Sequence, residues 1–204
     1  MDNSQHFFAE PVSGVDTLCT CRKYFGVTDG GYLYTDARLS QEMEKDVSYE
    51  RMEFVLGRYE CDASKFYEKA SSNNKIFENE DLKEMSLLTQ NLLKGIDYDF
   101  VIKRRIKNFE YLHNALGKTN KLELTVPIGA FMYPLYIENG MQIKKKLASD
   151  KIYIPTLWPD VLENCKQGSI EDDYAQNILP LPVDQRYGTE EMKKIKEAIL
   201  KCIS

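Results

Sequence analysis

The spacing of apolar residues changes along this 204-residue chain, and that change limits the folds open to it. Near the N-terminus, apolar residues form short runs of the kind found in strands, separated by loops, at residues 2–8, 15–21 and 31–35. From Ser48 onward they recur at helical intervals instead. This pattern predicts helices over residues 48–71, 80–93 and 98–116, with a break at Asn73-Asn74 and stops at Gly95 and Gly117.

Beyond Gly117 the pattern alternates between strands and helices. It predicts strands over residues 122–126, 130–137 and 152–155, an extended segment over 178–183, and helices over 140–149 and 189–203. Pro134 marks the strand over 130–137 as an edge or bulged strand, because proline cannot donate to a ladder. The fold class expected is α/β with an α+β C-terminal part, divided into regions 1–47, 48–117 and 118–204.

Charge and composition exclude several classes of function. A net charge of -5 and a pI of about 5.2 disfavour a nucleic-acid-binding protein, which needs a basic face. No apolar run approaches the ~20 residues that span a bilayer, and the first residues lack a signal-peptide pattern, so a cytoplasmic location is expected. Five cysteines with only two histidines predict neither a disulfide framework nor a metal site.

Lys23 lies in the most informative stretch, between a strand-like run and a loop that contains Asp29-Gly30-Gly31. Glycines permit unusual φ angles and close approach of the backbone. Asp2 and Gln5 lie on a segment that can run beside the strand leading to Lys23. A carboxylate, an amide and an amine at strand ends are typical of a ligand site in an α/β protein. The alternative is an ordinary surface lysine.

These residues resemble the DegT/DnrJ/EryC1/StrS aminotransferases, a fold-type I family that uses pyridoxal phosphate to aminate keto sugars. The family signature K-x5-E-G-G is similar to Lys23, five residues, Asp29, Gly30 and Gly31, with aspartate in place of glutamate. Residues 2–5 (DNSQ) match the D-x-x-Q portion of an upstream family segment. Three later segments also resemble the family: VIKRRIKNFEYLHNAL (101–116), GAFMYPLYIENGMQIKKKLASDKIYIPTLWP (129–159) and LPLPVDQRYGTEEMKKI (179–195).

The resemblance implies specific roles. Lys23 would bind pyridoxal 5'-phosphate covalently and then move protons, which requires a neutral amine. Asp2 would pair with the pyridine nitrogen. Gln5 would lie near the phenolic oxygen, and Cys21 occupies the place of a serine that contacts phosphate in relatives. For Asp2, a disordered terminal acid is the alternative.

Two further family positions differ from the pattern. Ser48 and Arg51 fall where relatives have an N-x-R helix start that reaches a neighbouring subunit's cofactor, but the asparagine is absent. A capped helix with an ordinary ion pair is the alternative. Trp158 stands in Leu157-Trp158-Pro159, where many relatives have His-Trp-Pro, so the sugar preference stays open.

Residues 184–187 (DQRY) resemble a family segment as well, but they are most simply interpreted as a turn in which an arginine binds a carboxylate before the last helix.

The resemblance implies a partial fold of type I: a remnant of the large domain with a partial parallel sheet over residues 1–47, a long helical connector over 48–117, and a small α+β C-terminal domain over 118–204. The family's phosphate loop, most of its large sheet and its ring-stacking aromatic residue precede the part that this chain resembles. Two hypotheses follow. The first is a C-terminal portion of an aminotransferase that acts on a nucleotide-sugar, with glutamate as the expected amino donor, as a homodimer or paired with an N-terminal half. The second is a non-catalytic remnant that dimerises or binds a partner. Neither hypothesis involves nucleic acid or a membrane.

Overall fold

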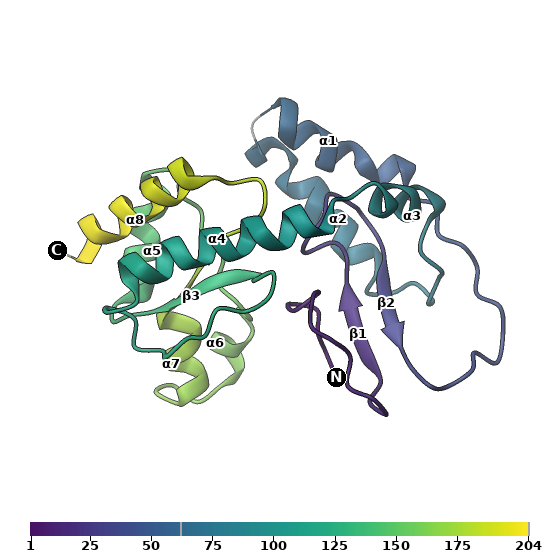
Figure 1. The fold of residues 1–204 in the computed structure, drawn as a ribbon, viewed down its shortest axis with the longest axis horizontal. Coiled ribbons are helices and arrows are strands. Elements are labelled where there is room, and N and C mark those ends of the chain that lie inside the picture. Colours follow the sequence, from purple (N-terminus) through teal and green to yellow (C-terminus); the bar gives the residue numbers. More distant parts are fainter. Residues whose placement is uncertain (62, 204) are drawn as a thin grey trace. The chain divides into compact units, whose positions relative to one another are not determined.

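The computed structural model describes residues 1–61 and 63–203 and forms two compact units, Met1–Asp97 and Tyr98–Ser204 (Figure 1). Helices and small sheets are mixed, which is consistent with the expected α/β class. The region 48–117 contributes helices to both units. The division into regions 1–47, 48–117 and 118–204 stays a prediction about domains.

The sheet of the first unit is antiparallel. Strand β1 (Thr17–Thr20) pairs with β2 (Gly31–Tyr34), and Leu18 lies opposite Leu33. The partial parallel sheet expected at the N-terminus is wrong for this pair, because the connection between the strands is too short for a parallel crossover. The strand expected over residues 2–8 is reduced to one parallel bridge between Asp2 and Leu18.

The single helix expected over residues 48–71 is also wrong. The chain forms η1 (Tyr49–Met52), α1 (Glu53–Glu60), η2 (Ala63–Phe66) and α2 (Tyr67–Ile76). Cys61 leaves the helix with an extended backbone. Gly57 allows the chain to fold back there, because a Cβ atom at this position would overlap the ring of Phe66.

Helix α2 continues through Asn73-Asn74, where a break was expected, because tertiary contacts hold both side chains. Asn73 Nδ2 donates to the carbonyl of Thr28 (2.9 Å), and Asn74 Oδ1 accepts from Arg22 Nη1 (2.7 Å). Helix α3 (Leu87–Lys94) is shorter than the expected 80–93. It begins at Ser86, whose Oγ accepts from the backbone N–H of Thr89 (3.1 Å).

The helices described in the second unit are α4 (Tyr98–Leu116), α5 (Gly140–Ser149), α6 (Val161–Asn164), α7 (Ile170–Asn177) and α8 (Thr189–Ile203). Three of them occupy residues that the sequence predicts to be helical. The predictions over 98–116, 140–149 and 189–203 are confirmed by α4, α5 and α8. The strands expected over 122–126 and 152–155 are absent from the described part of the chain.

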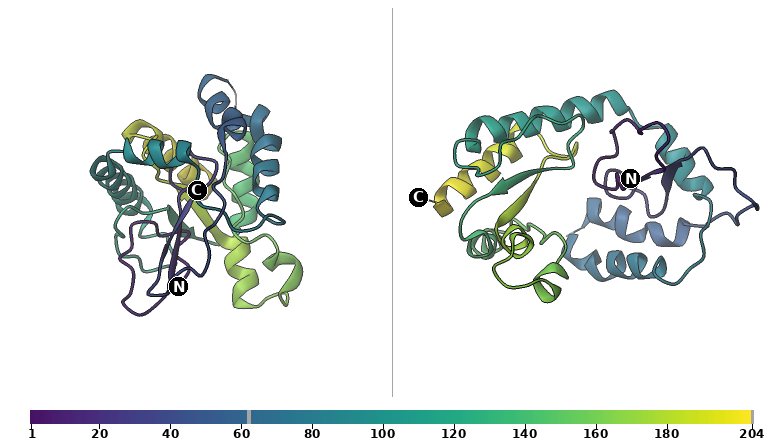
Figure 2. Two further views of the ribbon diagram at one scale, coloured as in Figure 1. Left: turned by 90° about the vertical axis from the view of Figure 1, so that its right-hand side faces the viewer. Right: turned by 90° about the horizontal axis from the view of Figure 1, so that it is seen from below.

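Strand β3 (Met132–Tyr136) pairs with β4 (Ile178–Pro182) in a two-stranded antiparallel sheet, drawn in Figure 2. Both strands contain prolines. Pro134 lies opposite Pro180, and the carbonyl of Pro134 points away from β4, where it accepts from Asn120 Nδ2 (2.8 Å). The backbone nitrogens of these prolines, which lack a hydrogen, therefore face outward, and no hydrogen bond between β3 and β4 is lost. Asn120 Oδ1 also accepts from the N–H of Tyr136 (3.0 Å), so this side chain takes the place of a neighbouring strand.

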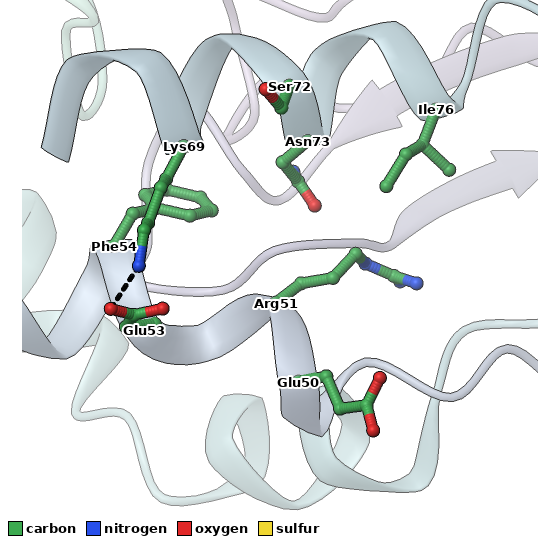
Figure 3. Close-up of a pocket in the computed structure, with 8 residues that line it drawn as sticks. All are labelled: Glu50, Arg51, Glu53, Phe54, Lys69, Ser72, Asn73 and Ile76. Carbon is green, nitrogen blue, oxygen red and sulfur yellow. Dashed lines mark ion pairs between the residues drawn. The ribbon is translucent and has the colours of Figure 1, made fainter.

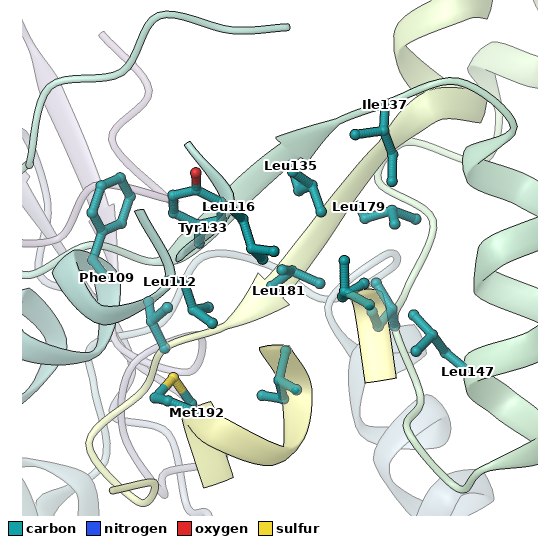
Figure 4. Packing of buried hydrophobic residues seen from close by; sticks show 14 of the residues in the cluster. Phe109, Leu112, Leu116, Tyr133, Leu135, Ile137, Leu147, Leu179, Leu181 and Met192 are labelled. Atoms are coloured by element: carbon teal, nitrogen blue, oxygen red, sulfur yellow. The ribbon is translucent and has the colours of Figure 1, made fainter. Parts of the chain in front are cut away.

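The core of the second unit lies where one face of this sheet meets α4, α5 and α8 (Figure 4). Tyr133, Leu135, Leu179 and Leu181 alternate with less buried neighbours or prolines along the two strands. Their partners from the helices include Phe109, Leu112, Leu116, Leu147, Met192, Ile195 and Ile199.

Polar contacts fix the entry to α8. The side chain of Arg105 is almost fully buried and donates to Gln185 Oε1 (2.9 Å) and to the carbonyl of Ala130 (2.8 Å). Arg186 binds Asp184 through two hydrogen bonds (2.9 and 2.8 Å). The expected turn with an arginine–carboxylate clamp is confirmed.

Candidate functional site

The structure brings Lys23 and Asp2 together through Ser4. Lys23 Nζ donates to Ser4 Oγ (3.2 Å), and the backbone N–H of Ser4 donates to Asp2 Oδ1 (2.8 Å). Both Lys23 and Asp2 present surface to solvent, although neighbouring protein atoms partly desolvate the amine of Lys23. A ligand can therefore approach the amine and the carboxylate from solvent.

Strand β1 positions both groups. On one side, the N–H of Leu18 donates to the carbonyl of Met1 (3.0 Å) and the N–H of Asn3 donates to the carbonyl of Leu18 (2.8 Å), which holds Asp2 beside the strand. At the end of β1, the N–H groups of Tyr24 and Phe25 both donate to the carbonyl of Cys21 (3.0 Å each). This turn places Lys23 close to the N-terminal segment.

The environment lowers the pKa of the Lys23 amine. Partial burial is the main cause; the charge of Asp2 raises this pKa, and the charge of Arg22 lowers it. The pKa of Asp2 is lowered by hydrogen bonds from the backbone and the side chain of Ser4, with a smaller contribution from the charge of Lys23. Asp2 is therefore ionised at neutral pH, and Lys23 is neutral in a larger fraction of molecules than an ordinary lysine.

Gln5 takes part through its backbone. Its carbonyl accepts from the hydroxyl of Tyr24 (2.8 Å), and Tyr24 belongs to an aromatic cluster with Phe7, Phe8 and Phe25. The rings of Phe7 and Phe25 meet edge to face at 4.9 Å. This cluster holds the segment that contains Asp2 against the turn that contains Lys23.

Cys21 is completely buried. Burial, with the charge of Asp29 and the neighbouring Cys19 as smaller causes, raises the pKa of its thiol to about 12. A neutral thiol with no exposed surface offers no donor to a phosphate group in this arrangement. The phosphate role of Cys21 stays a prediction without a contact to support it.

Ser48 and Arg51 are engaged elsewhere in the first unit. Ser48 is buried, and its Oγ lies 2.7 Å from Ser86 Oγ, with no side-chain cap on η1. Arg51 forms an ion pair with Asp46 and also donates to the carbonyl of Val47 (3.1 Å). These contacts match the alternative of an ordinary ion pair, but without the expected cap.

Arg51 also lines a pocket of about 200 Å³ between η1, α1 and α2 (Figure 3). The ion pair of Glu53 with Lys69 crosses this pocket. Neither Lys23 nor Asp2 is among its eight lining residues: Glu50, Arg51, Glu53, Phe54, Lys69, Ser72, Asn73 and Ile76.

Asp29 has a role that the sequence pattern alone did not reveal. Its carboxylate is buried and accepts from the backbone N–H of Ser86 (2.8 Å), from Ser86 Oγ (3.1 Å) and from Thr89 Oγ1. It therefore fixes the first turn of α3 to the loop that follows Lys23. The sequence signal for this contact is Ser86, a residue type that often caps a helix N-terminus, with Thr89 three residues later in the first turn.

The adjacent glycines lie close to other parts of the protein. Gly30 has a positive φ of 99°, and a Cβ atom there would lie 3.0 Å from the Met85 side chain and 3.1 Å from that of Thr89. At Gly31, a Cβ atom would lie 2.8 Å from the carbonyl oxygen of Cys19. The close approach expected from Gly-Gly is thus between this loop, α3 and β1.

Residues 1–61 and 63–203 were also searched for a metal site and for a membrane-spanning helix. No group of three or more His, Cys, Asp or Glu side chains in these ranges is arranged to hold a metal ion. No helix there combines the length and the apolar character needed to cross a bilayer.

Comparison with solved structures finds a neighbour for the fold of this chain. A crystal structure of a DegT DnrJ EryC1 StrS aminotransferase from Brucella abortus superposes with a TM-score of 0.58 at 14% sequence identity. The likeness is one of fold. The match covers 98% of this chain and 56% of the Brucella chain, so the chain spans little more than half the length of that enzyme.

Sequence comparisons add no second line of support. No protein-family model matches the chain. No curated protein matches it either. The expected resemblance to the DegT/DnrJ/EryC1/StrS aminotransferases is thus supported at the level of fold, by a distant structural neighbour.

Proposed function

We propose that this chain carries the amine and the acid of a pyridoxal phosphate site in an aminotransferase that acts on a keto sugar. The observation that supports this most directly is the Lys23–Ser4–Asp2 arrangement, with a lowered pKa at the amine. Covalent attachment is favoured by an amine whose pKa is lowered, and pairing with a pyridine nitrogen is favoured by an ionised carboxylate nearby.

Each residue has a defined part in this proposal. Pyridoxal phosphate, when bound, supplies the electron sink for transfer of an amino group. Lys23 would hold the cofactor and move a proton at Nζ, and the carboxylate of Asp2 would keep the ring nitrogen protonated. Ser4 orients both groups, while Gln5 lies beside them on the same segment.

The phosphate anchor is the part of the site that these residues do not supply. Cys21 is buried, and Arg51 pairs with Asp46. Backbone N–H groups at a helix N-terminus usually bind a cofactor phosphate. We therefore propose that activity on a nucleotide-sugar, with glutamate as donor, needs the remainder of the fold, either as an N-terminal half or from a second subunit.

Titration with pyridoxal phosphate tests the proposal. We expect a visible absorption band and, after borohydride reduction, a cofactor adduct located on Lys23 by peptide mass spectrometry, with Lys23→Ala losing both. The matched control is Lys144→Arg, because burial lowers the pKa of Lys144 as well. An adduct that is equally abundant on Lys144, or absent from Lys23, argues against the site.

A non-catalytic module that binds a partner is the second candidate. It is favoured by the apolar residues exposed on the first unit, such as Leu18, Leu33 and Leu39. This candidate predicts no adduct on Lys23 whether or not the remainder of an aminotransferase fold is added.

A further inference from the structure

The pocket between η1, α1 and α2 has two polar atoms that lack a partner. Asn73, which is only 4% exposed, and Arg51 both line this pocket. Asn73 Oδ1 and Arg51 Nε are buried, and neither has a hydrogen-bond partner among residues 1–61 and 63–203. Buried polar atoms are nearly always paired, because an unpaired one loses the hydrogen bonds that water would give it. The two atoms therefore indicate a place for a further polar group.

Existing contacts fix the direction of both side chains. Asn73 Nδ2 donates to the carbonyl of Thr28 (2.9 Å), so Oδ1 is the end of the amide that stays without a partner. Asn73 reaches from α2 toward η1, where the side chain of Arg51 lies (Figure 3). The Nη atoms of Arg51 bind Asp46 and the carbonyl of Val47. One acceptor from α2 and one donor from η1 thus meet at the same pocket.

The charges around the pocket are already paired. Arg51 pairs with Asp46, and Lys69 pairs with Glu53 across the pocket. An anionic ligand would therefore find no unpaired cation among the lining residues, and a neutral ligand is expected. The side chains of Lys69 and Glu53 are 52% and 61% exposed, so their ion pair can open to admit a ligand at little cost.

Size and apolar walls narrow the choice further. The pocket has a volume of about 200 Å³, and an apolar cavity of about 150 Å³ is large enough to hold benzene. Phe54 of α1 and Ile76 of α2 supply apolar walls. The space therefore suits a molecule with one small ring or branched chain and one polar group.

A carboxamide is the neutral group that both accepts and donates from adjacent atoms. We infer that this pocket binds a small primary carboxamide, whose carbonyl accepts from Arg51 Nε and whose N–H donates to Asn73 Oδ1. The apolar body of the ligand packs against Phe54 and Ile76. Neither Lys23 nor Asp2 lines the pocket, so the inference does not rest on the proposed function.

An NMR titration of the intact chain with benzamide tests the inference. We expect saturable binding, with nuclear Overhauser contacts from the benzamide ring to Phe54 and Ile76. Acetophenone keeps the ring and the carbonyl but has a methyl group in place of the amide nitrogen, so it leaves Asn73 Oδ1 unpaired. It should bind about tenfold more weakly. Benzoate should also bind about tenfold more weakly, because it adds a charge and offers no donor.

Variants locate the binding. Ile76→Trp should abolish binding of benzamide, because the larger side chain fills the pocket. Ile170→Trp is the matched control, since it makes the same change at an exposed isoleucine of α7 (70%) and should bind like the wild type. Ser72→Trp changes an exposed lining residue, so it blocks the pocket even if Ile76→Trp fails to fold. Lys23→Ala should bind benzamide normally, which separates this test from the cofactor proposal.

Four results would overturn the inference. The first is the absence of saturable benzamide binding. The second is equal affinity for benzamide and acetophenone, which would show that Asn73 Oδ1 takes no part. The third is tighter binding of benzoate, which would make the pocket an anion site. The fourth is unchanged binding by both Ile76→Trp and Ser72→Trp, which would place the ligand elsewhere.

Discussion

The amine of Lys23 and the carboxylate of Asp2 form an electrostatic pair whose two charges influence each other's titration. Burial lowers the pKa of Lys23, and the charge of Asp2 partly offsets this effect. Removing the negative charge should therefore lower the pKa of Lys23 further. Asp2→Asn is expected to shift the pH profile of Lys23 acylation toward lower pH, as measured by mass spectrometry of labelled peptides.

The control for this shift is Glu10→Gln, which removes an exposed acid from the same segment without touching Ser4. A profile that stays in place after Asp2→Asn, or moves to higher pH, would show that Asp2 does not act on Lys23. The test needs no cofactor, so it measures the electrostatics of the pair by itself.

Single residues were predictable where a motif fixed their neighbours. A strand-like segment that can run beside the one leading to Lys23, together with the family resemblance, suggested that Asp2 and Lys23 meet, and the structure connects them through Ser4. Asp29 was recognised only as part of a signature. Its contacts with Ser86 and Thr89 depend on where α3 begins, which apolar spacing placed too early in the chain.

Among the elements, α3 depends on the buried carboxylate of Asp29. Asp29→Ala would leave the N–H and hydroxyl of Ser86 without their buried acceptor. Leaving buried donors unpaired costs about 1–3 kcal/mol, and more where the lost partner is charged. We expect the free energy of unfolding to fall by about 3 kcal/mol in urea titrations.

Asp29→Asn keeps one acceptor oxygen and should lose less stability than Asp29→Ala. Asp36→Ala removes an exposed acid and serves as the control. Equal stability of Asp29→Ala and Asp36→Ala would mean that the Asp29 contacts do not hold α3 in place.

Helices were predictable where local signals agreed with packing. For α4, α5 and α8, apolar spacing and end signals coincide with the observed bounds. The helix over 48–71 failed because Gly57 lets Phe66 pack against α1, a contact that periodicity does not contain. The strand over 122–126 is absent because the Asn120 side chain already pairs with the edge of β3.

Across the whole molecule, the large apolar core lies entirely in the second unit. Every residue of that core cluster falls between Phe109 and Ile199. A fragment of residues 98–204 should therefore unfold in a single cooperative urea transition, followed by circular dichroism. The fragment of residues 1–97, with fewer buried apolar side chains and an open β2 edge, should unfold at lower urea concentration.

A non-cooperative transition for residues 98–204, together with a cooperative one for 1–97, would contradict this assignment of stability.

The mixed α/β class followed from the change in apolar spacing. The antiparallel pairing of β1 with β2 did not, because strand direction is set by a short connection rather than by side-chain alternation.

The paired prolines of the β3–β4 sheet have a consequence for self-association. Pro180 and Pro182 have no backbone N–H group to offer on the side of β4 that faces away from β3. The side chain of Asn120 occupies the far side of β3. Cross-β growth needs an unbroken row of donors and acceptors on an accessible strand. Neither margin of this sheet therefore offers the continuous row of backbone groups that fibril seeding from the native second unit would need.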